Sequence, residues 1–193
     1  MIIRKMFKFE NAHIVRDCTS RRCRTSIHGH SYRVEVLLES EWLDNAGMVY
    51  DFGLMKRGIK TLIDGFDHAT TIWAGDDSEY IAAVKQFSKR WVSVPVNPSA
   101  EQFCRIFFVL IDELLSLSVM NNGERGVQVQ SIIVHETDTG YAQCFRKDAY
   151  NANMGVIKPA DIVFSPEIIA SWDEPELLEW IVQKREIVNP TDV

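Results

Sequence analysis

Two stretches in which apolar and polar residues alternate place the strongest limit on how this chain can fold. In residues 2–13 the odd-numbered positions carry the apolar residues Ile3, Phe7 and Phe9 and end in His13. A second stretch begins at residue 28, and its largely apolar parity carries His28, His30, Tyr32, Val34, Val36 and Leu38. Because successive side chains of a strand point to opposite faces, each stretch predicts a strand with one buried face. The polar segment 14–27 between them predicts a long loop that joins an antiparallel pair.

The remaining sequence favours an α+β fold. Apolar residues at helical spacing predict helices over about 52–64, 76–91 and 98–119. Two further strands are expected over 127–136 and 141–147, joined by a tight turn. Helices that lie between two pairs of strands are typical of an antiparallel sheet with helices on one face. We therefore expect a four-stranded antiparallel sheet with two helices on one face, and one further, inserted helix.

The character of the chain changes after about residue 148. Prolines interrupt this part at positions 159, 166, 175 and 190. Two short helices are expected over 165–172 and 174–188, and no residue there suggests chemistry. We divide the chain into a body over residues 1–148 and a C-terminal helical extension over 149–193. The extension is expected to dock on the body or on a neighbouring subunit.

Composition limits the class of protein. The chain has 193 residues, a formal net charge of −6 and 46% hydrophobic residues, which suits a domain with a buried core. An acidic chain is a poor candidate for binding nucleic acid. No segment approaches the roughly 20 apolar residues that cross a bilayer, and the first residues carry charge too early for a signal peptide. We expect a soluble, cytoplasmic protein whose four cysteines are reduced and which binds neither nucleic acid nor membrane.

Three of the five histidines lie where the first two strands can bring them together. His28 and His30 are two positions apart on one strand face, with Cα atoms about 6–7 Å apart, so both imidazoles can reach one ion. His13 ends the neighbouring strand on its apolar parity. Three neutral imidazoles leave a fourth coordination position open, as in catalytic zinc sites. These residues predict a Zn²⁺ site, although a single histidine is more often a surface or hydrogen-bonded core residue.

A competing interpretation uses cysteines as metal ligands. Cys18 and Cys23 could join His28 and His30 in a structural zinc knuckle, which would have the required four ligands. Two ligands on neighbouring same-face positions of a strand suit the geometry of such a knuckle poorly. Outside this interpretation Cys18 has no assignable role.

Cys23 is the candidate reactive thiol. It lies five residues before His28, and the residues around it include Arg21, Arg22 and Arg24. Nearby positive charge or a metal lowers the pKa of a thiol from its usual value of about 8.5. A thiolate beside an open metal site can act as nucleophile, general base or fourth ligand. The alternative, an inert buried thiol, is our interpretation of Cys104 and Cys144.

Two further positions carry candidate acid–base groups. Asp67 directly precedes His68 after the end of a predicted helix, and a carboxylate that orients an imidazole forms a common proton-transfer pair. Adjacent residues do not always touch, so this signal is weak by itself. Glu136 ends a predicted strand on its apolar parity, where a carboxylate can accept N–H donors from a ligand. Most glutamates at strand ends are instead solvated.

These residues occur in an order that resembles the 6-pyruvoyl-tetrahydropterin synthase and 6-carboxy-tetrahydropterin synthase family. The matching motifs are His13, Cys23-x4-His28-Gly29-His30, Met48–Phe52, Asp67-His68, Pro98–Glu101 and His135–Thr137. The resemblance covers residues 1–148 and leaves the extension outside. It implies the tunnelling fold, in which three subunits join their sheets into one barrel and two trimers stack into a homohexamer. Such pairing would also cover the free edges of a four-stranded sheet.

The resemblance implies a zinc enzyme that acts on 7,8-dihydroneopterin triphosphate. The implied zinc ligands are His13, His28 and His30. Zinc would coordinate the side-chain hydroxyls of the pterin and acidify the neighbouring groups, after which triphosphate is eliminated. The resemblance does not identify the residues that bind triphosphate; the arginines of residues 21–24 are candidates.

The resemblance also implies roles for the remaining site residues. Cys23 would be the general base, and Asp67 with His68 would be the second proton-transfer pair. Glu136 would anchor the guanidine-like edge of the pterin by accepting two hydrogen bonds. Active sites of this family lie between subunits, so these residues need not all meet within one chain.

The spacing before the His-Gly-His motif bears on the product. Family members that make the carboxy product typically have three residues between the cysteine and this motif, animal-type pyruvoyl enzymes have five, and this chain has four. We favour 6-carboxy-5,6,7,8-tetrahydropterin, formed with loss of acetaldehyde and triphosphate and used for queuosine and other deazapurines, because that branch is widespread in microbes. The alternatives are a 6-pyruvoyl-tetrahydropterin synthase and a non-catalytic relative that binds zinc or pterin.

Overall fold

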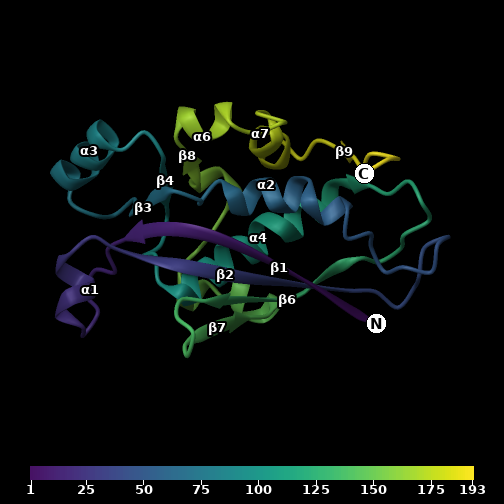
Figure 1. Cartoon of the computed structure of the whole chain (residues 1–193), viewed down its shortest axis with the longest axis horizontal. Coiled ribbons are helices and arrows are strands. Elements are labelled where there is room, and N and C mark those ends of the chain that lie inside the picture. The colour runs from purple at the N-terminus through teal and green to yellow at the C-terminus, as the bar shows by residue number, and fades with distance from the viewer.

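The two strands expected at the start of the chain form a long antiparallel pair in the computed structural model, which describes residues 1–193 (Figure 1). They are β1 (Ile2–His13) and β2 (His28–Glu39). Their register is unbroken from Ile2 opposite Glu39 to His13 opposite His28. Because the alternation is strict, this register brings the apolar parities of both strands to one face, which is buried.

The hairpin belongs to a larger sheet with the strand order β7-β6-β2-β1-β3-β4-β8. The other strands of this sheet are β3 (Ala69–Trp73), β4 (Trp91–Val94), β6 (Gln128–His135), β7 (Tyr141–Cys144) and β8 (Val163–Phe164). The pairs β1–β2, β2–β6 and β6–β7 are antiparallel, so the four strands expected from the sequence are present and adjacent.

The expectation of a sheet with only four strands is wrong, because the sheet is mixed and has seven. β3 pairs in parallel with the end of β1, through Asn11 and Ala12 only, and β4 pairs in parallel with β3. β8, from the C-terminal extension, completes this side by pairing with β4. These strands are short and their partners are distant in sequence, so local periodicity does not reveal them.

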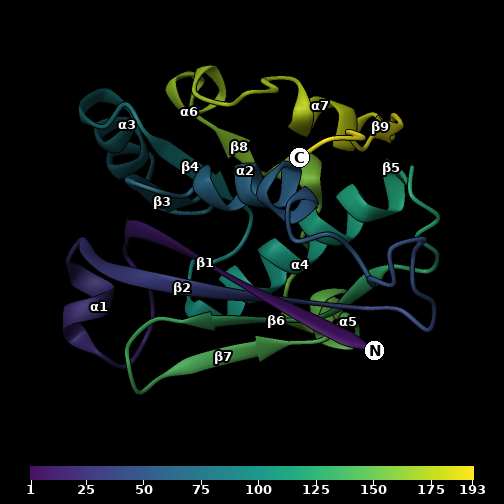
Figure 2. The same ribbon diagram turned by 45° about the vertical axis from the view of Figure 1, so that its right-hand side comes forward.

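Two helices cover the buried face of the antiparallel strands. α4 (Ala100–Leu117) lies against β6 and β7, and α2 (Gly58–Asp64) packs on α4 and β1 (Figure 2). The helix expected over 52–64 is in two pieces, because Arg57 leaves helical geometry between η1 (Leu54–Lys56) and α2. The inserted helix is α3 (Ser78–Phe87), which begins where the Asp77 side chain accepts hydrogen bonds from two backbone N–H groups.

The sequence predicted a loop for the whole segment between β1 and β2, and this prediction is wrong in part. The segment contains α1 (Arg21–Thr25), a short helix at the end of the hairpin where β1 finishes and β2 starts (Figure 1). A hydrogen bond from the backbone N–H of Val15 to the carbonyl of Cys23 ties it back to the chain after β1. Helices this short depend on such tertiary contacts and leave little periodicity to detect.

The extension shares the hydrophobic core of the body. It contains α6 (Pro166–Ala170), α7 (Leu177–Val182) and β9 (Ile187–Val188), and β9 pairs with β5 (Ser118–Val119). The remaining short helices are α5 (Arg146–Ala149), η2 (Ala152–Met154) and η3 (Pro159–Asp161). Phe164 contacts both Phe66 and Trp172, with ring centroids 5.4 and 5.0 Å apart. The helices expected over 165–172 and 174–188 are present in shorter form, as α6 and α7.

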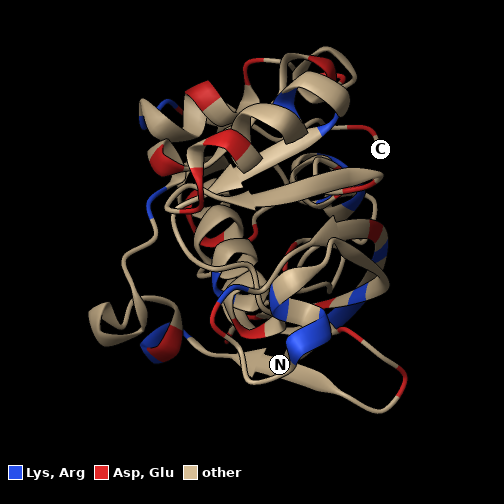
Figure 3. Cartoon of the chain, turned by 90° about the vertical axis from the view of Figure 1, so that its left-hand side faces the viewer, with Lys and Arg blue, Asp and Glu red and all other residues tan.

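None of the helices combines the length and apolar character needed to cross a membrane. Acidic and basic residues are interspersed along the chain when it is viewed from the α1 side (Figure 3).

Candidate metal centre

Three histidines from the two long strands meet at one end of the hairpin. Their candidate ligand atoms, one each from His13, His28 and His30, all lie within 4.8 Å of one another. The register explains this arrangement, because His13 faces His28 directly and His30 follows on the same face. Gly29 between the two β2 histidines allows a close approach, since a Cβ there would lie 3.2 Å from the carbonyl oxygen of Asn11. The cluster can therefore hold one metal ion.

Backbone carbonyls orient two of these imidazoles. His13 Nδ1 lies 2.6 Å from the carbonyl oxygen of Pro98, and His28 Nδ1 lies 3.0 Å from that of Ser26. A carbonyl oxygen only accepts hydrogen bonds, so each Nδ1 carries the proton and each Nε2 keeps a free lone pair. Metal-binding histidines usually donate their second ring N–H in this way. Pro98 precedes α4, so the core helix helps to position the cluster.

Burial keeps His13 and His30 neutral. His13 is fully buried, and this burial, together with His28 and His30 nearby, lowers its pKa to about 4 although the hydrogen bond to Pro98 opposes the shift. Burial also lowers the pKa of His30, against the opposing charge of Glu136. Neutral imidazole is the form that binds metals, so the site is ready to bind an ion at neutral pH without first losing a proton.

Glu136 reaches into the same site. Its Oε1 atom lies 3.7 Å from Nε2 of both His13 and His30. The hydroxyl of Tyr32 donates a hydrogen bond of 3.1 Å to this oxygen. The other oxygen, Oε2, has no protein partner, and the side chain is one-third exposed. Glu136 is thus held at one oxygen and open to a ligand at the other.

Tyr32 is a site residue that the sequence analysis assigned only to the core. It is buried, and its hydroxyl lies 3.4 Å from Nε2 of His13. Burial, and then the neighbouring Glu136 carboxylate, raise the pKa of Tyr32, so its hydroxyl remains a proton donor. Tyr32 lies two positions after His30, on the same face of β2 as His28 and His30, and this shared face was the sequence signal for a role at the site.

Cys23 lies on α1 beside this centre. Its Sγ contacts Ser20 Oγ at 3.3 Å, and its backbone carbonyl accepts a hydrogen bond from the N–H of Val15, two residues after His13. Cys18 Sγ instead contacts the carbonyl of Ser20 at 3.2 Å. Neither cysteine belongs to the metal-binding group, so the structure does not form the zinc knuckle considered above.

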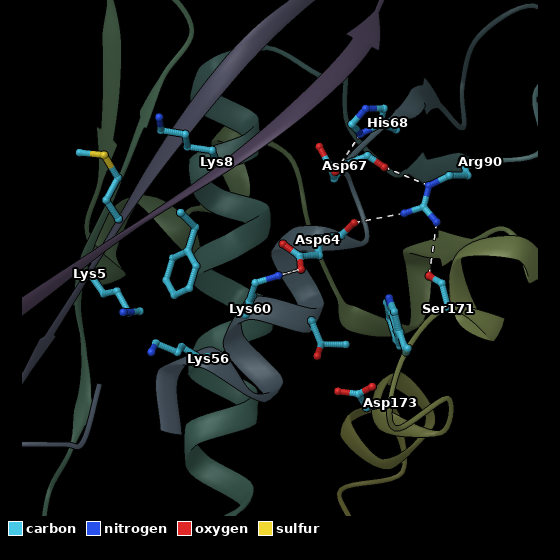
Figure 4. Close-up of a pocket in the computed structure, with 14 residues that line it drawn as sticks. Lys5, Lys8, Lys56, Lys60, Asp64, Asp67, His68, Arg90, Ser171 and Asp173 are labelled. Carbon is cyan, nitrogen blue, oxygen red and sulfur yellow. Dashed lines mark hydrogen bonds and ion pairs between the residues drawn. The ribbon is translucent and has the colours of Figure 1, made fainter. Parts of the chain in front are cut away.

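Asp67 and His68 form a contacting pair (Figure 4) that makes no bond to the three histidines. His68 Nδ1 lies 2.8 Å from Asp67 Oδ2, and the imidazole is largely exposed. The pair is fixed to the outer edge of β1: Glu10 N–H donates to Asp67 Oδ1, and His68 N–H donates to the carbonyl of Glu10, both at 2.7 Å. No hydrogen bond or ion pair joins either residue to His13, His28 or His30.

This anchoring affects both the charge and the backbone of the pair. Burial opposes ionisation of Asp67, but the hydrogen bonds from Glu10 and His68 hold the pKa of its carboxyl below the ordinary value. His68 has a φ of 52°, in the left-handed region that few residues other than glycine adopt. Such geometry is often found at functional sites.

Comparison with known sequences identifies relatives over almost the whole chain. A profile of the family described as 6-pyruvoyl tetrahydropterin synthase matches residues 2–147. A Helicobacter pylori (strain J99) protein named 6-carboxy-5,6,7,8-tetrahydropterin synthase is 38% identical over 183 residues, covering 94% of this chain and 92% of its own length. A protein of the same name from Aquifex aeolicus is 29% identical over 73% of this chain and 95% of its own. The Helicobacter protein therefore also matches much of the C-terminal extension.

Solved structures share the fold. The 6-pyruvoyl tetrahydropterin synthase of Caenorhabditis elegans superposes with a TM-score of 0.52 at 20% identity, over 75% of this chain and 94% of its own. An uncharacterised protein from Wolinella succinogenes superposes with a TM-score of 0.58 at 22% identity, over 76% and 98% of the two chains. The sequence match and the shared fold agree with the motif order, and the chain belongs to the 6-pyruvoyl tetrahydropterin synthase family.

Proposed function

We propose that this protein is a zinc-dependent 6-carboxy-5,6,7,8-tetrahydropterin synthase that acts on 7,8-dihydroneopterin triphosphate. The observation that carries the proposal is the cluster of His13, His28 and His30, with Glu136 directly beside it. Three neutral imidazoles, two with Nδ1 fixed on carbonyls, suit Zn²⁺ and leave a coordination position for substrate. The curated relative from Helicobacter pylori carries the name of this activity.

Zinc held by the three histidines would polarise the side-chain hydroxyls of the pterin and acidify the neighbouring C–H and O–H groups. The Sγ atom of Cys23 is the proposed base for the released proton, because α1 lies between His13 at the end of β1 and His28 at the start of β2 and is tied to Val15 by a backbone hydrogen bond. Glu136 receives the guanidine-like edge of the pterin, using Oε2 and the remaining lone pair of Oε1. The Tyr32 hydroxyl keeps the carboxylate turned toward the site.

Asp67 and His68 are the proposed second proton-transfer pair. The Asp67 carboxylate accepts a hydrogen bond from the Nδ1–H group of His68 and leaves Nε2 of the exposed ring to exchange a proton with substrate. Since the pair is anchored on the outer edge of β1 and has no bond to the metal ligands of its own chain, we assign it to the active site of a neighbouring subunit.

A shared active site requires an oligomer, and we propose a homohexamer built from two trimers. Over Ile2–Phe9, β1 has a strand partner only on its β2 side, and β7 is an end strand of the sheet with one free edge. Pairing of these edges between chains would satisfy their backbone groups. We place the protein in the cytoplasm, because its four cysteines are unpaired and Cys23 must stay a thiol.

We propose the carboxy product, which would serve queuosine and other deazapurine synthesis, because the Helicobacter and Aquifex relatives carry the name of the carboxy synthase. The test is incubation of the zinc-loaded protein with 7,8-dihydroneopterin triphosphate, followed by mass spectrometry of the pterin. Formation of 6-carboxytetrahydropterin with acetaldehyde is the expected result. The pyruvoyl product would replace this assignment with the alternative branch, and binding without release of triphosphate would indicate a non-catalytic relative.

A further inference from the structure

The short helix that carries Cys23 depends on the rest of the chain for its place. None of the five residues of α1 is buried, and no side chain caps its first turn. A helix of this length is not stable by itself, so tertiary contacts must hold it. Two hydrogen bonds tie it to the chain just after β1. The N–H of Val15 donates to the carbonyl of Cys23 at 3.1 Å, and the guanidinium of Arg16 donates to the carbonyl of Arg24 at 3.2 Å.

The side chain of Arg16 joins α1 to the segment that precedes α3. Its Nε atom donates to both carboxylate oxygens of Asp76, at 3.0 and 2.9 Å, while its Nη1 atom bonds the carbonyl of Arg24. The side chain of Asp76 is only 7% exposed, and the backbone N–H of Asp77 donates to one of its oxygens at 2.7 Å. Hydrogen bonds between ionised groups are stronger than those between neutral groups. Arg16 therefore connects α1 to a shielded and well-held carboxylate.

An aromatic ring of α3 also packs on this guanidinium. The Cζ atom of Arg16 lies 5.0 Å from the centroid of the Tyr80 ring, within the range of a cation–π contact. α1 and α3 lie at the same end of the molecule in both Figure 1 and Figure 2. The inserted segment between β3 and β4, which contains Asp76 and α3, thus supplies both contacts of the Arg16 side chain outside α1.

The backbone of Arg16 is fixed by another element, the connection from β4 to α4. The side-chain oxygen of Asn97 accepts a hydrogen bond from the N–H of Arg16 at 3.0 Å, and its Nδ2 atom donates to the carbonyl of Arg16 at 2.5 Å. The next residue is Pro98, whose carbonyl orients the imidazole of His13. The positions of Cys23 and of this metal ligand therefore depend on the same connection.

We propose that Arg16 is a positioning residue for the reaction, because it fixes α1 and, with it, the thiol of Cys23. The role of Cys23 as base rests on the proposed function, whereas the anchoring of α1 by Arg16 does not. A general base acts only within hydrogen-bond reach of the proton that it removes. Misplacement of such a group by about 1 Å can lower the rate on the order of a hundredfold. The loss of Arg16 should therefore reduce turnover without removing any group that contacts the substrate.

The first experiment follows amide hydrogen exchange of the purified protein by mass spectrometry. Arg16→Met removes the guanidinium and keeps an unbranched side chain. The amides of Val15 and Arg24 donate to the carbonyls of Cys23 and Ser20, so their exchange reports on the attachment and the turn of α1. We expect these amides to exchange roughly tenfold faster or more in the variant, while those of β2 keep their wild-type rates.

The matched control is Arg146→Met. Arg146 also forms an ion pair with a carboxylate, that of Asp112, and a cation–π contact with a tyrosine, Tyr150. It begins α5, which lies on the opposite side of the view from α1 in Figure 2. The control should leave exchange over residues 14–27 unchanged, because nothing in that segment contacts it.

Two results of the exchange experiment would overturn the proposal. One is wild-type exchange over residues 14–27 in Arg16→Met. The other is equally faster exchange throughout the chain, because Arg16 would then support the whole fold and not α1 in particular. If Arg16→Met does not fold, Arg16→Lys serves the same test, since one ammonium does not reproduce the two separated donors that reach Asp76 and Arg24.

The second experiment asks whether Arg16 acts through Cys23. Steady-state kinetics with 7,8-dihydroneopterin triphosphate should show kcat reduced roughly tenfold or more in Arg16→Met, with KM and zinc content close to wild type. In a Cys23→Ala background the same substitution should have little further effect, because the base that it positions is already absent. An unchanged kcat in Arg16→Met, or a full additional loss in the Cys23→Ala background, would overturn the link to Cys23. If the wild-type protein turns over no substrate, the proposed function fails, and hydrogen exchange still decides whether Arg16 anchors α1.

Discussion

Tyr32 donates a hydrogen bond of 3.1 Å to the Oε1 atom of Glu136, and the same oxygen lies 3.7 Å from Nε2 of His13. The phenol therefore links the buried core to the carboxylate that we propose as the pterin anchor. The contact joins residues 104 positions apart, so the β2–β6 pairing is needed to make it.

Replacement of Tyr32 by Phe should loosen Glu136 without emptying the metal site. Loss of one hydrogen bond to a charged group corresponds to about 1.5 kcal/mol, or roughly tenfold in kcat/KM. We expect the effect mainly in KM, with zinc content measured by atomic absorption unchanged. Wild-type kinetics in this variant would show that Tyr32 only fills the core.

Metal binding should depend on the clustered histidines and not on the exposed one. His28→Ala removes one of three ligands and should reduce zinc content after dialysis from about one ion per chain to a small fraction. His68→Ala is the matched control, because that imidazole is largely exposed and bonds only Asp67. Equal zinc loss in both variants would contradict the assignment of ligands.

The two cysteines near the site should behave differently. Cys23→Ala should retain zinc and lose turnover by about two orders of magnitude or more, as expected when a general base is removed. Cys18→Ala should retain both, since its Sγ contacts only the carbonyl of Ser20. Release of metal and unfolding in both variants would instead favour the structural zinc knuckle.

The sequence predicted best what depends on local alternation. The strands β1 and β2 follow from their parity, and with them the face shared by His13, His28 and His30. The carbonyl of Pro98 that orients His13 comes from 85 positions away, and no periodicity reveals such a contact. The same holds for β3, whose pairing with β1 goes with the hydrogen bond from His68 N–H to the carbonyl of Glu10 at the outer edge of β1.

The low pKa of His13 should make the zinc-free protein sensitive to mild acid. The unfolded chain takes up a proton at His13 as pH falls through about 6.5, whereas the folded chain stays neutral there until about 4. Between these values the unfolded state binds more protons, so the free energy of unfolding should decrease as pH falls, by about 3 kcal/mol in total. Urea unfolding of chelator-treated protein at pH 7, 6 and 5 measures this slope.

The variant His13→Gln should flatten that slope, because glutamine does not titrate, while His68→Gln should keep it. Comparing variants in this way removes the acid sensitivity that comes from carboxylates. An unchanged slope in His13→Gln would place the origin of the acid sensitivity elsewhere.

Arg105 should hold the start of the extension to α4. Its guanidinium is buried and donates to five backbone carbonyls, those of Asp148, Ala149, Asn151, Met154 and Gly155. Arg105→Met leaves these acceptors without a donor and should lower the free energy of unfolding by about 3 kcal/mol. Arg105→Lys should rescue little, because an ammonium offers three donors from one point instead of a planar fork. The exposed Arg125→Met control should stay within about 0.5 kcal/mol of wild type in urea unfolding, and an Arg105→Met variant as stable as that control would contradict the role.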